Sequence, residues 1–254
     1  MIKYLSKIIK NIHNIFLYPE SIKYFLTWKI FSFANYKIAI AIKKLNIAPE
    51  CIIDVGANIG QFSYTVSKIL KPEKIVLFEA NEELNQNLDK NLSEFSNISI
   101  FTKALSNKIE MRNFNIFTDS QVSSFNESGK DRNNFFPQDT NLKKILKIKT
   151  ETLDNFISSN PNLINNLSKT LLKLDVQGHE YEILKGCEKN IIKFKWVVLE
   201  ISHDILYENQ AQFNDIYKFL IDNNFSFSRP LNCHYQPNNK LIMESDMLFI
   251  NSKI

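Results

Sequence analysis

The sequence predicts an α/β domain built on a mostly parallel sheet with covering helices. Three observations lead to this fold class. Short apolar runs alternate with helical segments, two glycine turns directly follow apolar runs, and acidic residues end four of those runs. The chain has 254 residues, of which 44% are hydrophobic and 23% charged, so it can bury a large core. This composition excludes a disordered chain, a collagen-like fibre and a coiled coil.

The part of the chain after residue 50 begins with three strand-and-helix units. Apolar runs predict strands, and Pro72 ends the first helical segment. The predicted strands are Cys51–Asp54, Lys74–Ala80 and Asn97–Thr102, and the predicted helices are Ile59–Leu70 and Glu82–Leu92.

The middle of the chain interrupts this alternation. Glu110–Phe117 is expected to form an extra strand. Thr118–Asn141 is polar and contains Gly129 and Pro137, so we expect a loop or lid, inserted at residues 118–144. A strand at Leu146–Thr150 and a short helix at Thr152–Ser158 follow.

The last part of the chain resumes the alternation. Phe225–Ser228 and Met247–Asn251 are predicted to be neighbouring strands, with Arg229–Ser245 as the loop between them. The other predicted elements are strands at Thr170–Asp175 and Trp196–Ile201 and helices at Glu180–Lys189 and Asn214–Asn223.

Residues 1–46 form a separate basic helical segment ahead of the main domain, residues 47–254. Apolar residues recur at helical spacing from Ile2 to Phe16, and a second apolar stretch runs from Tyr24 to Ile42. Polar interruptions argue against a membrane span. These stretches are not followed by a small-residue cleavage site, which argues against a secretory signal. Two interpretations stay open: amphipathic helices packed on the main domain, or a basic anchor on an anionic membrane surface.

Charge and cysteine content limit the function further. The first 50 residues carry eight lysines and two glutamates, which leaves 23 of the 31 bases and 25 of the 27 acids for the rest. A slightly acidic body does not favour a nucleic-acid substrate. Three widely spaced cysteines without CxxC spacing indicate a reducing compartment, so we expect a cytoplasmic protein, with the inner face of the membrane as the alternative location.

The first glycine turn predicts a nucleotide-like cofactor site. Asp54-Val55-Gly56-Ala57-Asn58-Ile59-Gly60 joins a strand to a helix, and Glu79 ends the next strand, 19 residues after Gly60. A carboxylate at that spacing can accept both hydroxyls of an adenosine ribose. Asn58 stands where the dinucleotide motif requires glycine, and Asp54 suits the ammonium of a methionine tail better than a diphosphate. Both details favour S-adenosylmethionine over NAD.

The second glycine turn lies at the same predicted sheet edge. Asp175 ends an apolar strand in Leu174-Asp175-Val176-Gln177-Gly178-His179-Glu180, and Glu200 ends the next strand. Ligands of open α/β sheets bind beyond the carboxyl ends of the strands. The sequence therefore predicts that these acids lie near Asp54 and Glu79.

These blocks resemble the FkbM-type family of S-adenosylmethionine-dependent methyltransferases. IDVGANIGQFS, LFEANEE, KALS, TETLD, LKLDVQGHEYEILKG, VVLEIS and DMLFIN follow in the family's order across about residues 50–251. The resemblance implies the Rossmann-like class I methyltransferase fold, a seven-stranded sheet with an antiparallel last strand and helices on both faces. It also implies methylation of hydroxyl oxygens, on a sugar of a surface glycan or on a secondary metabolite.

The resemblance also implies roles for individual residues. Asp54, Gly56, Asn58 and Gly60 would line the methionine end, Glu79 would hold the ribose, and Ala104 and Leu105 would cradle the adenine. Ala57, Ala80 and Asp175 complete the predicted cofactor site. His179 departs from the small residue expected after Gly178, and residues 118–141 match the family only loosely.

A sugar hydroxyl is a weak nucleophile, so a general base is expected near the methyl group. The candidates are Asp175, His179, Glu180, Glu200 and His203, and histidine has the best-matched ordinary pKa. Either histidine could instead be a capping or surface residue, and Glu180 could cap its own helix. Asp175, Glu180, Glu200 and His203 could also hold a divalent cation, although their spacing matches no metal motif and none is expected.

Two other functions remain as alternatives. A nicotinamide-dependent oxidoreductase is disfavoured by Asn58 and by the lack of an obvious Tyr-x-x-x-Lys pair. A non-catalytic methyltransferase fold, acting as a partner through its basic N-terminal helices, is disfavoured by the four acids at the strand ends. The expected partner is a small-molecule or glycan acceptor, and the sequence leaves the oligomeric state open.

Overall fold

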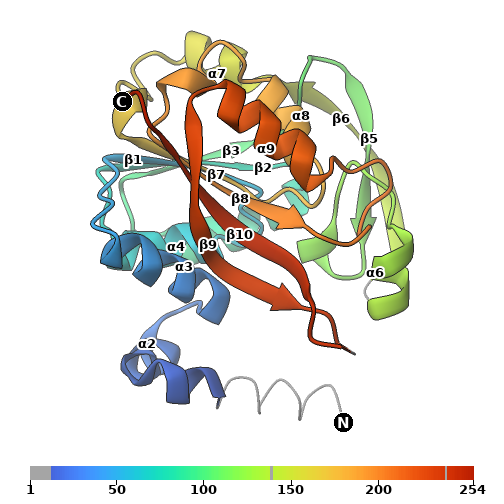
Figure 1. Cartoon of the computed structure of the whole chain (residues 1–254), viewed down its shortest axis with the longest axis horizontal. Coiled ribbons are helices and arrows are strands. Elements are labelled where there is room, and N and C mark those ends of the chain that lie inside the picture. Colours follow the sequence, from blue (N-terminus) through green and yellow to red (C-terminus); the bar gives the residue numbers. More distant parts are fainter. Residues whose placement is uncertain (1–12, 138–139, 238) are drawn as a thin grey trace.

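The computed structural model describes residues 13–137, 140–237 and 239–254. Its main sheet has seven strands in the order β3-β2-β1-β7-β8-β10-β9 (Figure 1). β10 runs antiparallel to both of its neighbours, and the pairs among β3, β2, β1, β7 and β8 are parallel. The predicted sheet with an antiparallel last strand is confirmed. The strands are β1 (Cys51–Val55), β2 (Lys74–Glu79), β3 (Ile98–Thr102), β7 (Thr170–Leu174), β8 (Trp196–Ser202), β9 (Phe225–Tyr235) and β10 (Ile242–Asn251).

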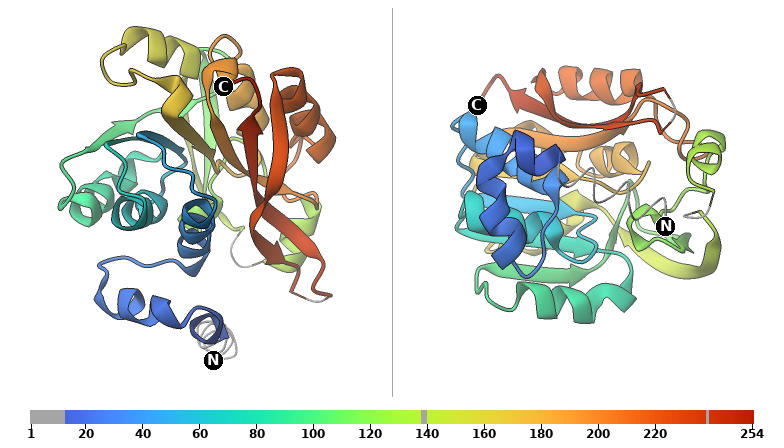
Figure 2. Two further views of the ribbon diagram at one scale, coloured as in Figure 1. Left: turned by 60° about the vertical axis from the view of Figure 1, so that its left-hand side comes forward. Right: turned by 90° about the horizontal axis from the view of Figure 1, so that it is seen from below.

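Helices cover both faces of this sheet, as predicted (Figures 1 and 2). One core lies under α7, α8 and α9 and includes Phe156, Leu184 and Leu220. The opposite core lies under α3 and α4 and includes Ile42 and Phe62. The helices are α3 (Phe33–Lys44), α4 (Gln61–Ile69), α5 (Asn85–Leu92), α7 (Leu153–Ser159), α8 (Glu180–Lys185) and α9 (Phe213–Asp222), with 3-10 turns at Glu82–Leu84, Leu167–Lys169 and Ile191–Lys193.

A second, smaller sheet carries the predicted insertion. It has the order β4-β6-β5, from β4 (Ala104–Leu105), β5 (Met111–Phe117) and β6 (Leu142–Glu151). Between β5 and β6 lie a 3-10 turn (Ser120–Val122) and α6 (Lys130–Phe135). Side chains of the insertion bind the main domain: Ser124 Oγ donates to the carbonyl of Gln177 at 2.7 Å, and Asn126 Nδ2 to that of Gly178 at 2.8 Å. The segment therefore packs over the second glycine turn.

Two predicted element boundaries are wrong. Most of the predicted loop Arg229–Ser245 belongs to β9 and β10, which form a long hairpin. The polar composition of this stretch is that of a loop. In the structure several of these polar side chains are buried and form hydrogen bonds across the hairpin; Asn232 Nδ2, for example, donates to Asp246 Oδ2 at 3.1 Å. The helix predicted over Glu180–Lys189 ends at Lys185. Gly186 follows it and packs against the Ser106 carbonyl, where a Cβ atom would come within 2.1 Å. A glycine that directly follows a helix is a common stop signal.

The N-terminal segment is only partly described. The helix predicted from Ile2 to Phe16 lies mostly outside the described residues, of which 13–17 are helical. A 3-10 turn (Pro19–Ser21), α2 (Ile22–Thr27) and α3 follow, and α3 packs on the main domain. Among the described residues, no helix is long and apolar enough to cross a membrane.

Candidate active site

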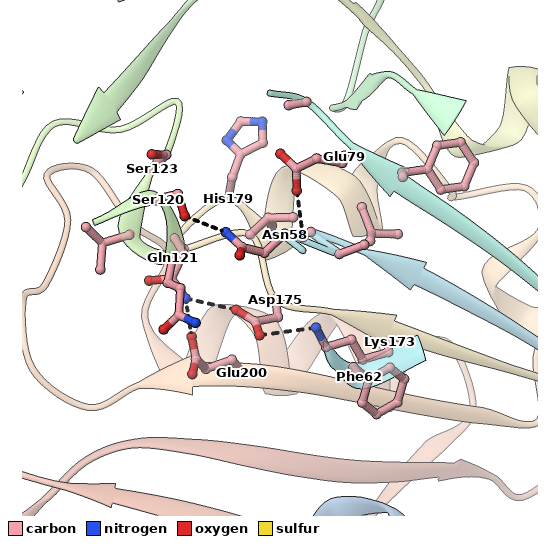
Figure 3. A pocket seen from close by; sticks show the side chains of 18 of the residues that line it. Asn58, Phe62, Glu79, Ser120, Gln121, Ser123, Lys173, Asp175, His179 and Glu200 are labelled. Carbon is pink, nitrogen blue, oxygen red and sulfur yellow. Dashed lines mark hydrogen bonds and ion pairs between the residues drawn. The ribbon is translucent and has the colours of Figure 1, made fainter. Parts of the chain in front are cut away.

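A cavity of about 300 Å³ lies at the carboxyl ends of the parallel strands (Figure 3). The glycine turn after β1, the end of β2 and the residues of β4 line one half, which we call the cofactor half. The ends of β7, β8 and β10, together with α6, line the other, which we call the acceptor half. The N-terminal end of α3 and the 3-10 turn of the insertion complete the wall. The two predicted glycine turns therefore lie in one site.

The turn after β1 has the backbone shape that its glycines predict. Gly56 has a φ of +83°, and a Cβ atom there would come within 1.8 Å of the Asp175 carbonyl oxygen. Asn58 has a φ of 49°, a left-handed conformation that asparagine tolerates better than most residues. Its Nδ2 donates to Ser120 Oγ at 3.2 Å, which joins the turn to the insertion.

Glu79 is the best-defined carboxylate of the cofactor half. Its Oε2 accepts the Asn58 amide at 2.7 Å and its Oε1 accepts the Asn81 amide at 2.8 Å. A carboxylate has about four lone-pair sites, so each oxygen can accept one more hydrogen bond. Burial raises the pKa of Glu79 to about 7, although the amides of Asn81 and Asn58 oppose the shift.

The other predicted cofactor residues occupy different positions around this half. Ala57, Ala80, Ala104 and Leu105 line the cavity together with Gly56 and Asn58. Gly60 does not line it; Gly60 precedes α4 with a φ of +88° and packs against Leu92.

Asp54 lies behind the cavity wall rather than in it. Its fully buried carboxylate accepts Ser63 Oγ at 2.7 Å and faces Lys173 Nζ at 3.4 Å. Lys173 also pairs with Asp175 at 3.1 Å, and both of these residues line the cavity. Burial disfavours the charged ammonium and by itself lowers the pKa of Lys173. The negative charges of Asp175 and Asp54 outweigh this effect, so the pKa of Lys173 is raised. The predicted contact of Asp54 with a methionine ammonium stays a prediction.

His179 lines the cavity but is a poor candidate for the general base. Its Nε2 lies 3.0 Å from Ser106 Oγ, and its ring lies 4.9 Å from that of Phe125. Burial, reinforced by Arg112 and Lys185, lowers the pKa of His179 to about 3. The imidazole therefore stays neutral and has little capacity to take a proton from a hydroxyl.

Glu180 and His203 do not line the cavity. Glu180 Oε1 accepts the amides of Val176 at 2.9 Å and Gly178 at 3.3 Å, so it holds the second glycine turn in shape. His203 lies farther along, where its Nε2 is 2.7 Å from Ser245 Oγ. Of the five candidates for the general base, the structure thus brings Asp175, His179 and Glu200 together in the cavity lining.

The acceptor half gathers four carboxylates, two of which the sequence analysis missed. Asp175 and Glu200 were expected; Glu244 and Asp246 of β10 join them in the lining. In the antiparallel ladder, Asp246 lies opposite Glu200 and Glu244 opposite Ser202. Two acids two residues apart share one face of a strand, which was a usable signal, but it was hidden in a segment assigned as a loop.

Gln177 connects this cluster and was also missed. Its Nε2 donates to Asp175 Oδ1 and to Glu200 Oε2, both at 2.8 Å. Its Oε1 accepts from Tyr207 Oη at 2.7 Å and from Arg132 Nη2 at 3.2 Å. All four hydrogen-bonding sites of the amide are therefore used to fix two carboxylates and two donors.

Arg132 brings a cation from the insertion into the acceptor half. Its Nη2 pairs with Glu244 Oε1 at 3.3 Å, and its guanidinium carbon lies 4.6 Å from the centre of the Tyr207 ring. The side chain is buried and its Nε has no hydrogen-bond partner among the described residues. Only the three-dimensional fold brings α6 to β10.

The carboxylates of the acceptor half differ in basicity. Burial, reinforced by the neighbouring acids, raises the pKa of Glu200 well above its usual value. Burial also raises the pKa of Glu244 to about 7 and that of Asp246 to about 6. Burial acts in the same direction on Asp175, but Lys173 and Gln177 outweigh it and lower the pKa of Asp175. Glu200 therefore combines a raised pKa with a place in the lining.

A metal site is not formed by these residues. Across residues 13–137, 140–237 and 239–254, no group of three or more His, Cys, Asp or Glu side chains is arranged to hold a metal ion. Within the predicted set, Glu180 and His203 point to partners outside the cavity.

Comparison with known proteins identifies the family. A family model described as the methyltransferase FkbM domain matches residues 54–227. The chain belongs to this family. The match covers both glycine turns, Glu79, Asp175, the insertion and Glu200, and it confirms the family predicted from the sequence. With the family comes S-adenosylmethionine, the predicted cofactor. A search of curated proteins gave no match.

Solved structures of similar fold are methyltransferases of low sequence identity. Magnesium protoporphyrin IX methyltransferase from Synechocystis PCC 6803, with bound SAM, is 13% identical, with a TM-score of 0.46, over 87% of this chain and 81% of that one. Precorrin-6y C5,15-methyltransferase from Geobacter metallireducens GS-15 is 13% identical, with a TM-score of 0.43, over 84% and 86%.

Proposed function

We propose that this FkbM-family methyltransferase transfers a methyl group to a hydroxyl of a neutral or cationic small molecule, such as a sugar unit of a glycan. The observation that carries the proposal is one cavity that joins Val55–Asn58 and Glu79 to a carboxylate cluster around Glu200. One half of the cavity suits a nucleoside, and the other holds bases for a hydroxyl proton.

The cofactor half fits S-adenosylmethionine on three structural grounds. Gly56 and Ala57 line the cavity with little or no side chain, so a ligand can approach the backbone of the turn. Both oxygens of Glu79 keep a free lone pair for the two hydroxyls of a ribose. Ala104 and Leu105 supply a small apolar wall for the adenine. When bound, the cofactor supplies an electrophilic methyl group on a sulfonium.

The residues of the acceptor half would orient the hydroxyl and take its proton. Glu200 is our candidate for the general base, because burial and the neighbouring acids raise its pKa, which makes its carboxylate a stronger base, and because Gln177 fixes its position. Glu200 is one of the five candidates from the sequence, among which the ordinary pKa favours the two histidines. Holding the hydroxyl in line with the methyl group would supply much of the rate.

The charges of this half favour neutral or cationic acceptors. Four carboxylates face two cations, Lys173 and Arg132. Even with Glu200 protonated, the other three carboxylates outnumber the cations once the pH exceeds the pKa of Glu244, about 7, so this half is then negative. A phosphate or carboxylate on the acceptor would be repelled, since such repulsion is strong where water is excluded. This supports the expectation that the acceptor is not a nucleic acid.

The proposal is tested by methyl transfer to a panel of acceptors. The protein is incubated with S-adenosylmethionine labelled in its methyl group and with neutral glycosides, amino sugars and sugar phosphates. We expect label in an alkali-stable methyl ether of a neutral or amino sugar. Glu200→Gln should lower kcat by about 10²- to 10⁴-fold, whereas Glu188→Gln, at an exposed site outside the cavity, should leave it unchanged. Transfer to none of the acceptors, or equal rates for the two variants, would contradict the proposal.

A further inference from the structure

Residues 13–31 form a segment that stands off the main domain, and we call it the N-terminal arm. Both figures of the whole chain show α2 and the helical residues before it away from the sheet, beyond α3 (Figures 1 and 2). The arm connects directly to α3, whose first residues line the cavity. Whatever binds the arm is therefore held close to the candidate active site.

Aromatic contacts fix the inner side of the arm. The Tyr24 ring lies 4.6 Å from that of Trp28 and 5.8 Å from that of Tyr36 on α3. The Trp28 ring lies 5.8 Å from that of Tyr64 on α4, and the Lys29 amide donates to Tyr64 Oη at 3.3 Å. These contacts give the arm a defined orientation on the domain, so its opposite side is presented consistently.

The arm also carries exposed apolar side chains. Phe16 is 85% exposed, Leu26 73% and Leu17 59%, and Ile22 is exposed as well. Phe25 is partly exposed too, but its ring packs against those of Phe31 and Phe33. Four large apolar side chains on one short segment, without such ring contacts among the described residues, are unusual for a surface that faces only water. Such a group marks a surface that becomes covered in the working protein.

The charge of the N-terminal sequence indicates what covers this surface. Residues 1–50 carry eight lysines and two glutamates, whereas the remaining chain has 23 bases and 25 acids. Lys23 and Lys29 belong to the described arm, and Lys37, Lys43 and Lys44 to α3. A basic sequence that carries exposed apolar residues is typical of segments that lie in the interface of an anionic bilayer.

We propose that the N-terminal arm docks this methyltransferase on an anionic bilayer surface, with Phe16, Leu17 and Leu26 inserted among the lipid headgroups. Ser32 and Asn35, which directly follow the arm in the sequence, line the cavity, so docking holds the cavity near the lipid surface. If the proposed transfer reaction is correct, the acceptor is then a molecule held at the membrane. The docking itself does not depend on that reaction.

The test is co-sedimentation of the full chain with vesicles, in the absence of cofactor. Vesicles of phosphatidylcholine with phosphatidylglycerol are compared with vesicles of phosphatidylcholine alone. We expect binding to the anionic vesicles only, and weaker binding at about 1 M salt, where the screening length falls to about 3 Å. The triple variant F16S/L17S/L26S should bind at least about tenfold more weakly. The matched variant I109S/M111S/I145S replaces three exposed apolar residues on or beside β5 and β6 and should bind like the wild type.

Three outcomes would overturn the proposal. The first is no binding to anionic vesicles, and the second is an equal loss of vesicle binding in both triple variants. The third is a protein that binds no vesicles but forms a concentration-dependent dimer in sedimentation velocity, which only F16S/L17S/L26S abolishes. The last outcome would assign the arm to a second copy of the chain. Circular dichroism checks that all variants fold, and titration with S-adenosylhomocysteine reports separately on the proposed function.

Discussion

The two halves of the cavity are built in different ways. The cofactor half comes from three short segments, the turn after β1, the end of β2 and β4, and uses mainly backbone shape and backbone amides. The acceptor half comes from α6, β7, β8 and β10 and uses side-chain charges, with Gln177 between them. A half made of backbone is rigid and tied to local sequence. The charged side chains of the acceptor half can be replaced to suit another substrate without a change in the sheet.

The largest effect is expected from Gly56→Ala in the cofactor half. The new Cβ atom would meet the Asp175 carbonyl at 1.8 Å, and the φ of +83° is strained for alanine. We expect a loss of roughly 4 kcal/mol in the free energy of unfolding and no measurable affinity for S-adenosylhomocysteine. Urea denaturation and calorimetry measure the two quantities.

Gly129→Ala is the matched control in the acceptor half. Its Cβ atom would lie 2.5 Å from the Ile205 carbonyl, so stability should fall there too. The affinity of the folded fraction for S-adenosylhomocysteine should stay unchanged. If both variants lost the same affinity, the division of the cavity into two halves would be incorrect.

Lys173→Met tests the boundary between the halves. Removing this buried ammonium leaves Asp54 and Asp175 without their cation, so the free energy of unfolding should fall by roughly 3 kcal/mol. Adding Asp54→Asn removes one of the two carboxylates left without a cation and should recover part of the lost free energy of unfolding. Urea denaturation of the single and double variants measures this coupling, and an unrecovered loss would show that Asp54 and Lys173 act independently.

Arg132→Met tests the charge balance of the acceptor half through its pH dependence. Without the guanidinium, Glu244 must be buried charged or take up a proton. Its folded pKa of about 7 already lies above the ordinary 4.5, so its contribution to stability falls as pH rises between these values. The variant should lose about 2 kcal/mol at pH 8 and clearly less at pH 5.5. Urea denaturation at both pH values measures it, and the same loss at both would rule out this explanation.

The smallest effect is expected from Asn58→Gly, which removes the hydrogen bond between the turn after β1 and the insertion. Glycine accepts the φ of 49° easily, so stability should change by less than about 1 kcal/mol. The hydrogen bond to Ser120 is lost, which should make residues 118–141 more open to proteolysis. Ser120→Ala removes the same bond from the other side and should give the same cleavage rate.

The difference between the halves also explains what could be predicted from the sequence. Glu79 and the turn Asp54–Gly60 were found because strand, glycine and acid occur at fixed spacing. Arg132 and Gln177 were missed because no local pattern connects them to the acids. Glu244 and Asp246 had a local signal, two acids two residues apart, but only the pairing of β10 with β8 brings them to Glu200. His203 was selected because it follows Glu200 at a strand end and has a suitable ordinary pKa, but it does not line the cavity.

The fold itself was predictable for a related reason. Buried parallel strands are continuous apolar runs, so β1, β2, β7 and β8 were located to within a residue or two. The hairpin β9–β10 buries polar residues such as Asn232, Glu244 and Asp246 through hydrogen bonds and ion pairs, and its composition therefore resembles that of a loop.

The most direct test of a cofactor half distinct from an acceptor half is calorimetric titration with S-adenosylhomocysteine at pH 8 and pH 6. The account predicts binding by the wild type, a loss of roughly 10- to 100-fold in Glu79→Gln, and unchanged affinity in Glu200→Gln. Wild-type affinity should be weaker at pH 6, because Glu79, with its pKa of about 7, must release a proton to accept two hydroxyls, and Glu79→Gln should lose this dependence. No binding by the wild type, or equal losses in the two variants, would contradict it.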